Sequence, residues 1–363
     1  MTASLRVLTW PDYALRGLIS LARERLEIEV EWSCFDRNEE AFGLVAFQPD
    51  RFDVIFADGT WPRRYLDEGL VAPLDPESFA GWPTLEPACR ERCLSLWTSG
   101  ERMVAAYPAF WGVRGLIVDA DAFGEADSRQ ALWDAPAGTA WVNSQGFEVI
   151  AEVALLRGHQ SEVAYALDEL ALGGVGDQLN ELAGRLGGVW RLLPDLIHAF
   201  AQGAIIAEVH STSLAENVRA ATGRDVRAVV PREGTVAWVD RAMIATGASD
   251  VKAAAAFIDL ALSPDGVGVQ WQESDGYWSA NAAAMATIAQ DQRFAEKMRP
   301  ARAAAGLLGR CATYQAPSNT VAYSRVWDAA LDRVGRVPAS VRTTAAMLAG
   351  GLVPGGLDVR EQA

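Results

Sequence analysis

The sequence has little histidine and cysteine, and it lacks the motifs around which most catalytic sites are built. It contains three histidines and four cysteines in 363 residues. His159, His198 and His210 lack the spacing of metal ligands, and only Cys89 and Cys93 stand four residues apart, as on one helix face. No GxSxG, HExxH, P-loop or strand-linked GxGxxG motif occurs. We therefore expect no enzyme activity, no cofactor and no metal site.

A basic excess and a long apolar run are also missing. The net charge is −15, so the surface repels phosphate backbones, which argues against nucleic-acid binding and weakly favours a cationic ligand. The best apolar run, Ala253 to Leu262, is interrupted by Asp259 and is too short to span a bilayer. Met1 leads directly into a strand-like run at Leu5 without a basic or apolar leader. Either a leader was removed from this chain, or the protein is cytoplasmic.

Strand-like and helix-like segments alternate along a chain that is long enough for two lobes. The predicted strands are Leu5–Thr9, Glu29–Trp32, Asp53–Ala57, Met103–Tyr107, Val113–Asp119, Ala140–Asn143, Ala204–Val209, Asp225–Val230 and the apolar run Val236–Ala245. The predicted helices are Leu15–Glu27, Asn38–Phe47 with Asn38 as N-cap, Trp61–Leu70, Phe147–Arg157, Val163–Leu172, Asp177–Leu186, Asp250–Leu262, Gly266–Glu273, Ala282–Met298, Asn319–Val334 and Ser340–Leu348. Pro108–Gly112 is predicted to connect two strands, and the glycines at 173, 174 and 176 to form a loop.

These patterns predict an α/β fold in which each lobe is a mixed sheet flanked by helices. No flexible linker separates two halves, so we expect the chain to cross between the lobes twice, near 113–116 and near 238–243. The predicted N-terminal lobe comprises 1–113 and 238–285, and the C-terminal lobe comprises 114–237 and 286–363. We expect the ligand in a cleft between the lobes, closed by a hinge motion.

Tryptophan is abundant, with 13 residues, and several stand at strand ends. Trp10 follows the first predicted strand, while Asp58 and Trp61 follow the third. Ligands of open α/β sheets bind outside the carboxyl ends of the strands. Aromatic faces and carboxylates together suit a small amine, through cation–π contacts of about 2 kcal/mol and charge-assisted hydrogen bonds of about 1.5–3 kcal/mol. The alternative is that each tryptophan is a core or rim residue.

Asp240 interrupts the apolar run from Val236 to Ala245. A buried carboxylate is costly unless it is paired. Because successive strand residues face opposite sides, Arg241 is expected to point away from Asp240. Asp240 therefore either contacts a ligand or pairs with Arg241 or Arg114.

Several segments, in this order, resemble the periplasmic spermidine/putrescine-binding protein family of ABC importers, which are type II periplasmic binding proteins. These segments are Leu8–Tyr13, Asp53–Trp61 with Tyr65–Leu70 and Pro73–Asp75, Pro108–Leu116, Val230–Asp240, and Ala254–Pro264 with Gly276–Tyr277. The resemblance implies a two-lobed, periplasmic solute-binding protein that captures a polyamine or related small amine and delivers it to an ABC permease. We expect a monomer.

The same resemblance implies roles for individual residues. It places Trp10, Tyr13, Trp238 and Tyr277 in the aromatic walls of the ligand site, and it makes Asp240 the amine-binding carboxylate and Glu148 a second carboxylate. Four positions depart from the family pattern: Asp58 replaces a small hydroxyl residue, Gln145 an acid and His210 a tryptophan, and Arg114 intrudes near the first crossing. These departures fit an altered amine with a single cationic end and a polar tail.

Two alternatives stay open at this point. Arg114 and His210 can instead clamp a small anionic or zwitterionic ligand, such as a carboxylate or phosphonate. The fold can also be reused by a leaderless cytoplasmic protein, either an enzyme or a sensor.

Overall fold

The computed structural model describes residues 3–35, 37–59, 61–94, 103–274, 276–295, 298, 311–338 and 341. Within these ranges the chain forms two compact units. The first draws on residues up to 111 and on 239–298, and the second on 112–238 and on the described residues from 311 onward. Most of the predicted helix Ser340–Leu348 lies outside the described residues.

The sheet of the first unit is mixed. Its order is β11-β4-β10-β3-β1-β2, where β1 is Ala3–Thr9, β2 is Ile28–Cys34, β3 is Val54–Asp58, β4 is Tyr107–Val113, β10 is Val236–Ile244 and β11 is Trp278–Ser279. β1 is parallel to β2 and β3, whereas β10 runs antiparallel to β3. All five residues of β3 are buried, as expected of a strand that is covered on both faces. This register places Asp240 of β10 directly opposite Asp58 at the end of β3.

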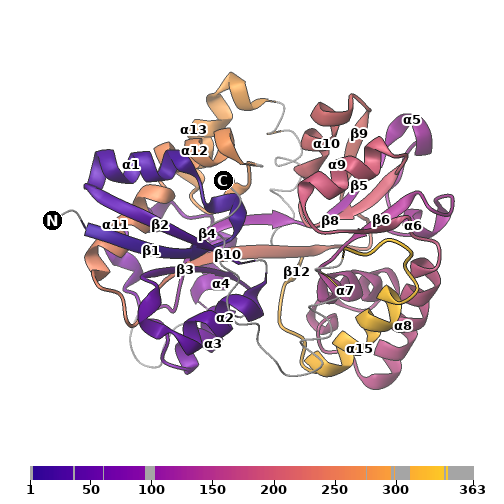
Figure 1. The fold of residues 1–363 in the computed structure, drawn as a ribbon, viewed down its shortest axis with the longest axis horizontal. Coiled ribbons are helices and arrows are strands. Elements are labelled where there is room, and N and C mark those ends of the chain that lie inside the picture. Colours follow the sequence, from indigo (N-terminus) through magenta and orange to yellow (C-terminus); the bar gives the residue numbers. More distant parts are fainter. Residues whose placement is uncertain are drawn as a thin grey trace. The chain divides into compact units, whose positions relative to one another are not determined.

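Helices cover both faces of this sheet. They are α1 (Arg16–Leu26), α2 (Asn38–Phe47), α3 (Trp61–Asp67), α4 (Pro87–Leu94), α11 (Val251–Ala261), α12 (Pro264–Glu273) and α13 (Ala282–Gln290). Figure 1 shows α1 and α12 on one side of the sheet and α2 and α3 on the other. Because α13 packs against α12, residues 286–298 belong to the first unit, although the sequence analysis assigned them to the second lobe.

The prediction of Asn38 as an N-cap is wrong. The N-cap of α2 is Arg37, and Asn38 is the first helical residue. The Asn38 side chain is buried, and its Oδ1 accepts a hydrogen bond from the backbone N–H of Asp58 at 3.0 Å. Asn38 therefore ties α2 to the end of β3, where Asp58 lies.

The second unit contains a sheet of order β7-β6-β8-β5-β9. Its strands are β5 (Gly115–Asp119), β6 (Ala140–Asn143), β7 (Gly188–Trp190), β8 (Ile206–Val209) and β9 (Val226–Val229). β6 is parallel to β7 and β8, and β5 is antiparallel to β8 and β9. A two-residue strand, β12 (Ala312–Thr313), pairs with the start of β10. With both units built from mixed sheets and helices, the predicted α/β class is confirmed.

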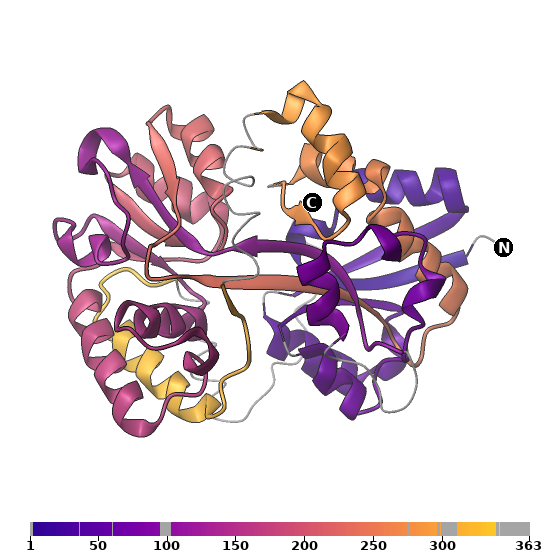
Figure 2. The same cartoon turned by 180° about the vertical axis from the view of Figure 1, so that it is seen from behind.

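The helices of the second unit form two groups on opposite faces of its sheet. They are α5 (Ala120–Phe123), α6 (Ala131–Asp134), α7 (Gly146–Leu156), α8 (Glu169–Ala183), α9 (Leu193–Ala201), α10 (Leu214–Thr222) and α15 (Thr320–Leu331). Figure 2 shows α7, α8 and α15 packed together, and α9 and α10 are likewise neighbours. A core cluster that includes Trp190, Leu196 and Phe200 fills the space under α9 and α10.

Several local predictions differ from the structure. Pro108–Gly112 lies inside β4 and not between two strands, and of the strand predicted at Met103–Tyr107 only Val104 forms a bridge before β4 starts at Tyr107. The helix predicted at Val163–Leu172 begins only at Glu169, after the Asp168 side chain accepts the N–H of Ala171.

The predicted glycine loop is part of α8. Gly174 faces the Arg157 guanidinium, which a Cβ at this position would approach to 2.8 Å, and a Cβ on Gly176 would lie 3.4 Å from Val326 of α15. A Cβ on Gly173 would meet nothing within 4 Å, so close packing does not explain all three glycines, and the helix is held by its packing against α7 and α15.

Candidate functional site

Asp240 is held by the end of β1. The chain leaves β1 at Trp10 and forms a 3₁₀ turn, Pro11–Tyr13, which directs the Tyr13 side chain inward. The Tyr13 hydroxyl donates to Asp240 Oδ2 at 2.5 Å, and both residues are buried. The Tyr13 ring packs on Phe110 and Phe56, with ring centroids 4.8 Å and 5.7 Å apart. Apolar packing therefore fixes the donor that orients the carboxyl group.

Asp58 lies directly across the sheet from Asp240. Residues opposite one another on antiparallel strands project from the same face, and like charges there repel. Asp58 Oδ1 accepts the N–H of Gly59 and, at 3.1 Å, the N–H of Val239. Asp58 Oδ2 and Asp240 Oδ1 accept no hydrogen bond of regular geometry from the residues that the structure describes. Each carboxyl group thus has one oxygen without a regular hydrogen bond among the described residues.

The two carboxyl groups hold protons more tightly than usual. Burial raises the pKa of Asp240 to about 7, opposed by the Tyr13 hydroxyl and the Trp10 indole. Burial, followed by the charge of Asp240, also raises the pKa of Asp58 well above its ordinary value. Arg241 moderates both pKa values but is itself bonded to the carbonyl of Gly59. A cation placed beside the two carboxyl groups would favour their ionised forms.

Further aromatic and acidic groups adjoin this pair. The Tyr277 hydroxyl donates to Asp12 Oδ2 at 2.7 Å, and the Tyr277 ring meets the Tyr13 ring edge-on with centroids 6.0 Å apart. The Asp12 charge also raises the Tyr13 and Asp240 pKa values, and the Asp240 charge in turn raises the pKa of Asp58. We call Asp12, Asp58 and Asp240 the carboxyl cluster of the first unit.

Trp10 and Trp61 differ in their surroundings. Trp10 is half-buried, stacks on Phe35 with centroids 4.3 Å apart, and lies near enough to Asp240 to lower its pKa, although Nε1 makes no regular hydrogen bond. Trp61 is buried at the start of α3, where its ring packs against Phe42 and beneath the Arg64 guanidinium. The structure thus gives Trp61 a packing role in the core.

The second unit contains a buried ion network around Arg114, between β4 and β5. The Arg114 side chain is 2% exposed. Its Nη2 lies 2.5 Å from Glu208 Oε1, its Nε 3.5 Å from Glu152 Oε2, and its Nη1 donates to Gln145 Oε1 at 2.6 Å. Arg129 donates to the other oxygen of Glu152 at 2.6 Å. We call Arg114, Arg129, Glu152 and Glu208 the ion network of the second unit.

Opposing effects set the pKa values in this network. Burial raises the pKa of Glu208 to about 7, although Arg114 opposes it. Burial also disfavours the charge of Arg114, but Glu208, Glu152 and Glu148 outweigh burial and raise the Arg114 pKa. The Arg114 guanidinium therefore stays charged and pairs with carboxylates of its own chain.

The remaining predicted residues of the second unit lie close to this network or to β10. Gln145 precedes α7, and the nearly buried Glu148 lies in its first turn. The Trp238 indole donates to the backbone oxygen of His210 at 2.8 Å, and its ring lies against Gly112, where a Cβ would come within 2.4 Å. Burial, with the nearby Arg114 charge, lowers the pKa of His210 to about 3, so its imidazole is neutral at pH 7.

The predicted site residues thus fall into two sets. The first unit brings together Trp10, Tyr13, Asp58, Asp240 and Tyr277 and also contains the buried Trp61, and the second unit holds Gln145, Glu148, His210 and Trp238. Sequence reasoning missed Asp12, Glu152 and Glu208. Glu208 interrupts the apolar strand Ile206–Val209, which is the same signal that drew attention to Asp240.

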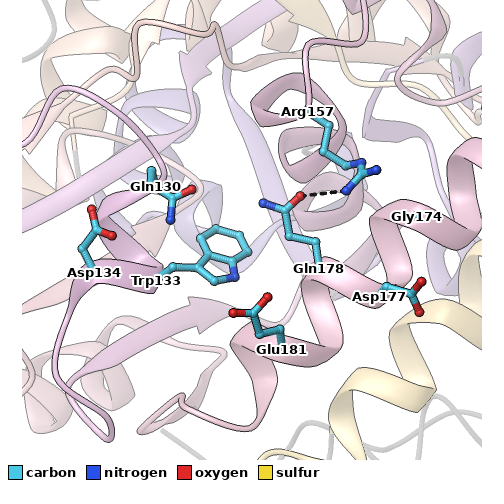
Figure 3. A pocket seen from close by; sticks show the side chains of 8 residues that line it. All are labelled: Gln130, Trp133, Asp134, Arg157, Gly174, Asp177, Gln178 and Glu181. Atoms are coloured by element: carbon cyan, nitrogen blue, oxygen red, sulfur yellow. Dashed lines mark hydrogen bonds between the residues drawn. The ribbon is translucent and has the colours of Figure 1, made fainter.

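A surface pocket of about 540 Å³ lies elsewhere in the second unit. Figure 3 shows the Trp133 ring among Gln130, Gln178 and Glu181, with Arg157 bonded to Gln178. None of the predicted site residues lines this pocket. In the described part of the chain, no group of three or more His, Cys, Asp or Glu side chains is arranged to hold a metal ion. No helix among the described residues has both the length and the apolar character to cross a membrane.

Residues 27–296 match the family model for bacterial extracellular solute-binding proteins. The chain belongs to this family. Its members are the substrate-binding proteins of ABC transporters and are not enzymes, which confirms the predicted family and the expectation of no catalytic activity. The spermidine/putrescine-binding periplasmic protein of Escherichia coli (strain K12) is 21% identical over 284 residues, or 76% of this chain and 77% of that protein.

Solved structures of solute-binding proteins share the fold. The spermidine/putrescine ABC transporter substrate-binding protein PotD of Streptococcus pneumoniae has a TM-score of 0.70 and 20% identity, over 91% of this chain and 99% of that chain. AgtB of A. tumefaciens R10, in complex with agropinic acid, has a TM-score of 0.61 and 17% identity, over 96% and 99%. The type II periplasmic binding protein fold is therefore confirmed, while these neighbours have different ligands.

Proposed function

We propose that this solute-binding protein captures a small organic amine through the carboxyl cluster of the first unit and supplies it to an ABC permease outside the cytoplasm. The observation that carries the proposal is Asp240: a buried carboxyl, oriented by Tyr13 and opposite Asp58, with one oxygen left for a ligand. The relatives that bind spermidine and putrescine support the amine class. A monomeric state belongs to the same proposal.

Charge favours an amine over an anion. The anionic alternative needs Arg114 and His210 as free positive groups. Arg114 instead donates to Gln145 and Glu208, and the low pKa of His210 leaves its imidazole neutral. The first unit, in contrast, concentrates carboxyl groups whose raised pKa values the positive charge of Arg241 opposes only in part.

The expected interaction energies suit a small ligand. A charge-assisted hydrogen bond to a carboxylate contributes roughly 1.5–3 kcal/mol, and a desolvated ammonium over an aromatic face about 2 kcal/mol. Tyr13, Tyr277 and Trp10 supply aromatic groups next to the carboxyl cluster. An ammonium group can therefore gain from both kinds of contact.

Isothermal titration calorimetry at pH 8 with mono-, di- and polyamines tests this function. We expect at least one amine to bind, and Asp240→Asn to weaken that binding by tenfold or more. Glu68→Gln is the matched control, because it removes one exposed carboxylate of the same unit. Unchanged binding in Asp240→Asn would remove the role given to that residue, and a folded wild-type protein that binds no amine would contradict the proposed function.

A further inference from the structure

The pocket beside Trp133 is separate from the residues that the sequence analysis assigned to the ligand. It has a volume of about 540 Å³ and lies within the second unit, between α6, the end of α7 and α8. This volume falls in the range of about 300–1,000 Å³ that is typical of small-molecule sites. Apart from the Trp133 ring, the side chains that line it are amides, carboxylates and the Arg157 guanidinium (Figure 3). The lining therefore suits a polar ligand.

The Trp133 indole carries a hydrogen-bond donor without an acceptor. The residue is 7% exposed, and its Nε1 makes no hydrogen bond within the described part of the chain. Because most buried polar groups are hydrogen-bonded, an orphaned donor indicates a place for a missing partner. Figure 3 shows Nε1 on the edge of the ring that faces the Glu181 carboxylate. Glu181 is exposed and can turn aside, so an acceptor can reach the indole N–H from the pocket.

The wall formed by Arg157 and α8 presents further donors. Arg157 Nη1 donates to Gln178 Oε1 at 3.2 Å, which leaves the Gln178 amide nitrogen directed toward Trp133 (Figure 3). The Arg157 guanidinium lies against Gly174, where a Cβ would come within 2.8 Å of Nη2. Glycine inside a helix is unfavourable by itself, but at this position it leaves room for the guanidinium. The structure gives Arg157 no ion pair with a described residue, so its other N–H groups can bond to a ligand.

A hydroxyl group matches this arrangement better than an ion does. The Trp133 indole only donates, and the Glu181 carboxylate only accepts. A hydroxyl group between them accepts from the indole and donates to the carboxylate, whereas an ammonium group cannot accept and a carboxylate cannot donate. The charged groups that line the pocket are of both signs and exposed, and ionic attraction at exposed positions is weak.

We propose that this pocket is a second binding site, and that its ligand is a neutral polyhydroxylated molecule, a saccharide. One hydroxyl group bridges Trp133 Nε1 and Glu181, and neighbouring hydroxyl oxygens accept from Gln178 and Arg157. The inference does not depend on the proposed amine-binding function, because the lining residues all belong to the second unit and the carboxyl cluster belongs to the first.

Nuclear magnetic resonance of the ¹⁵N-labelled full chain tests the inference through the indole N–H signals of its 13 tryptophans. Trp133→Phe identifies the Trp133 signal by removing it. The probes are D-glucose, D-galactose and myo-inositol, with ethylamine and acetate as the ionic comparisons. We expect at least one of the three polyols to shift the Trp133 signal in a saturable manner, and ethylamine and acetate to leave it in place.

Variants of Glu181 test the bridging hydroxyl group. Glu181→Ala removes the acceptor and should raise the Kd of that polyol at least tenfold, whereas Glu181→Gln keeps an acceptor oxygen and should change it by less than threefold. Glu162→Ala is the matched control, because it removes an exposed glutamate of the same unit that does not line the pocket. Calorimetry on these surface variants decides the same question if Trp133→Phe does not fold.

Three results would overturn the inference. If no polyol shifts the Trp133 signal, or if a polyol shifts only other indole signals, the pocket is not a saccharide site. If ethylamine shifts the Trp133 signal and Glu181→Gln abolishes that shift, the pocket binds a cation instead. Equal effects of Glu181→Ala and Glu162→Ala on polyol binding would remove the role of Glu181. None of these outcomes bears on amine binding by the carboxyl cluster, which is measured separately through Asp240→Asn.

Discussion

Asp240 in the first unit and Glu208 in the second are the same kind of residue in opposite surroundings. Each is a buried carboxyl on a strand, and burial raises the pKa of each to about 7. Asp240 faces another carboxyl, Asp58, whereas Glu208 lies 2.5 Å from the Arg114 guanidinium. The second unit thus pairs Glu208 with a cation of its own chain, whereas we propose that Asp240 in the first unit binds a cationic ligand. Burial of a carboxyl group alone does not mark a ligand site. The two cases differ in whether a cation of the same chain is bonded to the carboxyl group.

The raised pKa of Asp240 has a consequence for the stability of the folded protein. The pKa of Asp240 in the folded protein exceeds its value in the unfolded chain, so the folded state binds the proton more tightly. Stability from this group is therefore greatest below the unfolded pKa of about 4 and is lost as pH rises to about 7. A cationic ligand that binds only the folded state offsets this loss by mass action.

The largest expected effect comes from Arg114→Met, which leaves the network carboxylates without their central cation. Breaking a buried ion pair from one side costs about 3–5 kcal/mol. Urea denaturation should show this loss in the free energy of unfolding. Arg232→Met is the matched control, because its pair with Asp127 is exposed to solvent and its loss should leave the free energy of unfolding nearly unchanged. Equal losses in the two variants would remove the distinction between the buried network and the surface.

A smaller effect of opposite sign is expected for Asp240→Asn without ligand. The amide keeps an acceptor for Tyr13 but carries no charge, so the melting temperature at pH 8 should rise above that of the wild-type protein. Near pH 5 the gain should shrink, because the folded wild-type protein is then already protonated at Asp240. Glu208→Leu should instead lower the melting temperature at pH 8, since the Arg114 guanidinium and the backbone N–H of Asn143 each lose a buried acceptor. The same sign for both variants would contradict the comparison.

The smallest effect is expected for Thr235, an uncharged residue that is hydrogen-bonded to the ion network of the second unit. Thr235 Oγ1 lies 2.8 Å from the backbone oxygen of Arg114 and 3.0 Å from Glu152 Oε1. Thr235→Val should lower the free energy of unfolding by about 1–2 kcal/mol, because a buried carboxylate loses a donor. The exposed Thr246→Val is the control, and its urea midpoint should stay close to that of the wild-type protein. A loss at Thr235 no larger than that at Thr246 would argue against a tightly coupled network.

Periodicity and strand ends predicted a large part of this architecture. The apolar runs of β3 and β10 each predicted a strand, and the interruption of the second run singled out the carboxyl group of Asp240. The same reasoning failed for the glycines of α8, where packing of the helix against α7 and α15 overrides low helix propensity, and for Asn38, whose side chain bonds to Asp58 instead of capping a helix. Local sequence pattern carries no information on which distant side chain a given residue will contact in the folded protein.

The sequence by itself determined the α/β class, the solute-binding family and the residues worth examining, because these depend on local pattern and on the order of segments. Only the tertiary structure decided the role of each charge. It paired Arg114 with Glu208 across 94 residues, and it set Asp58 opposite Asp240 through the register of two strands distant in the chain. Whether a buried charge is compensated depends on contacts between remote segments, and those contacts form only when the chain folds.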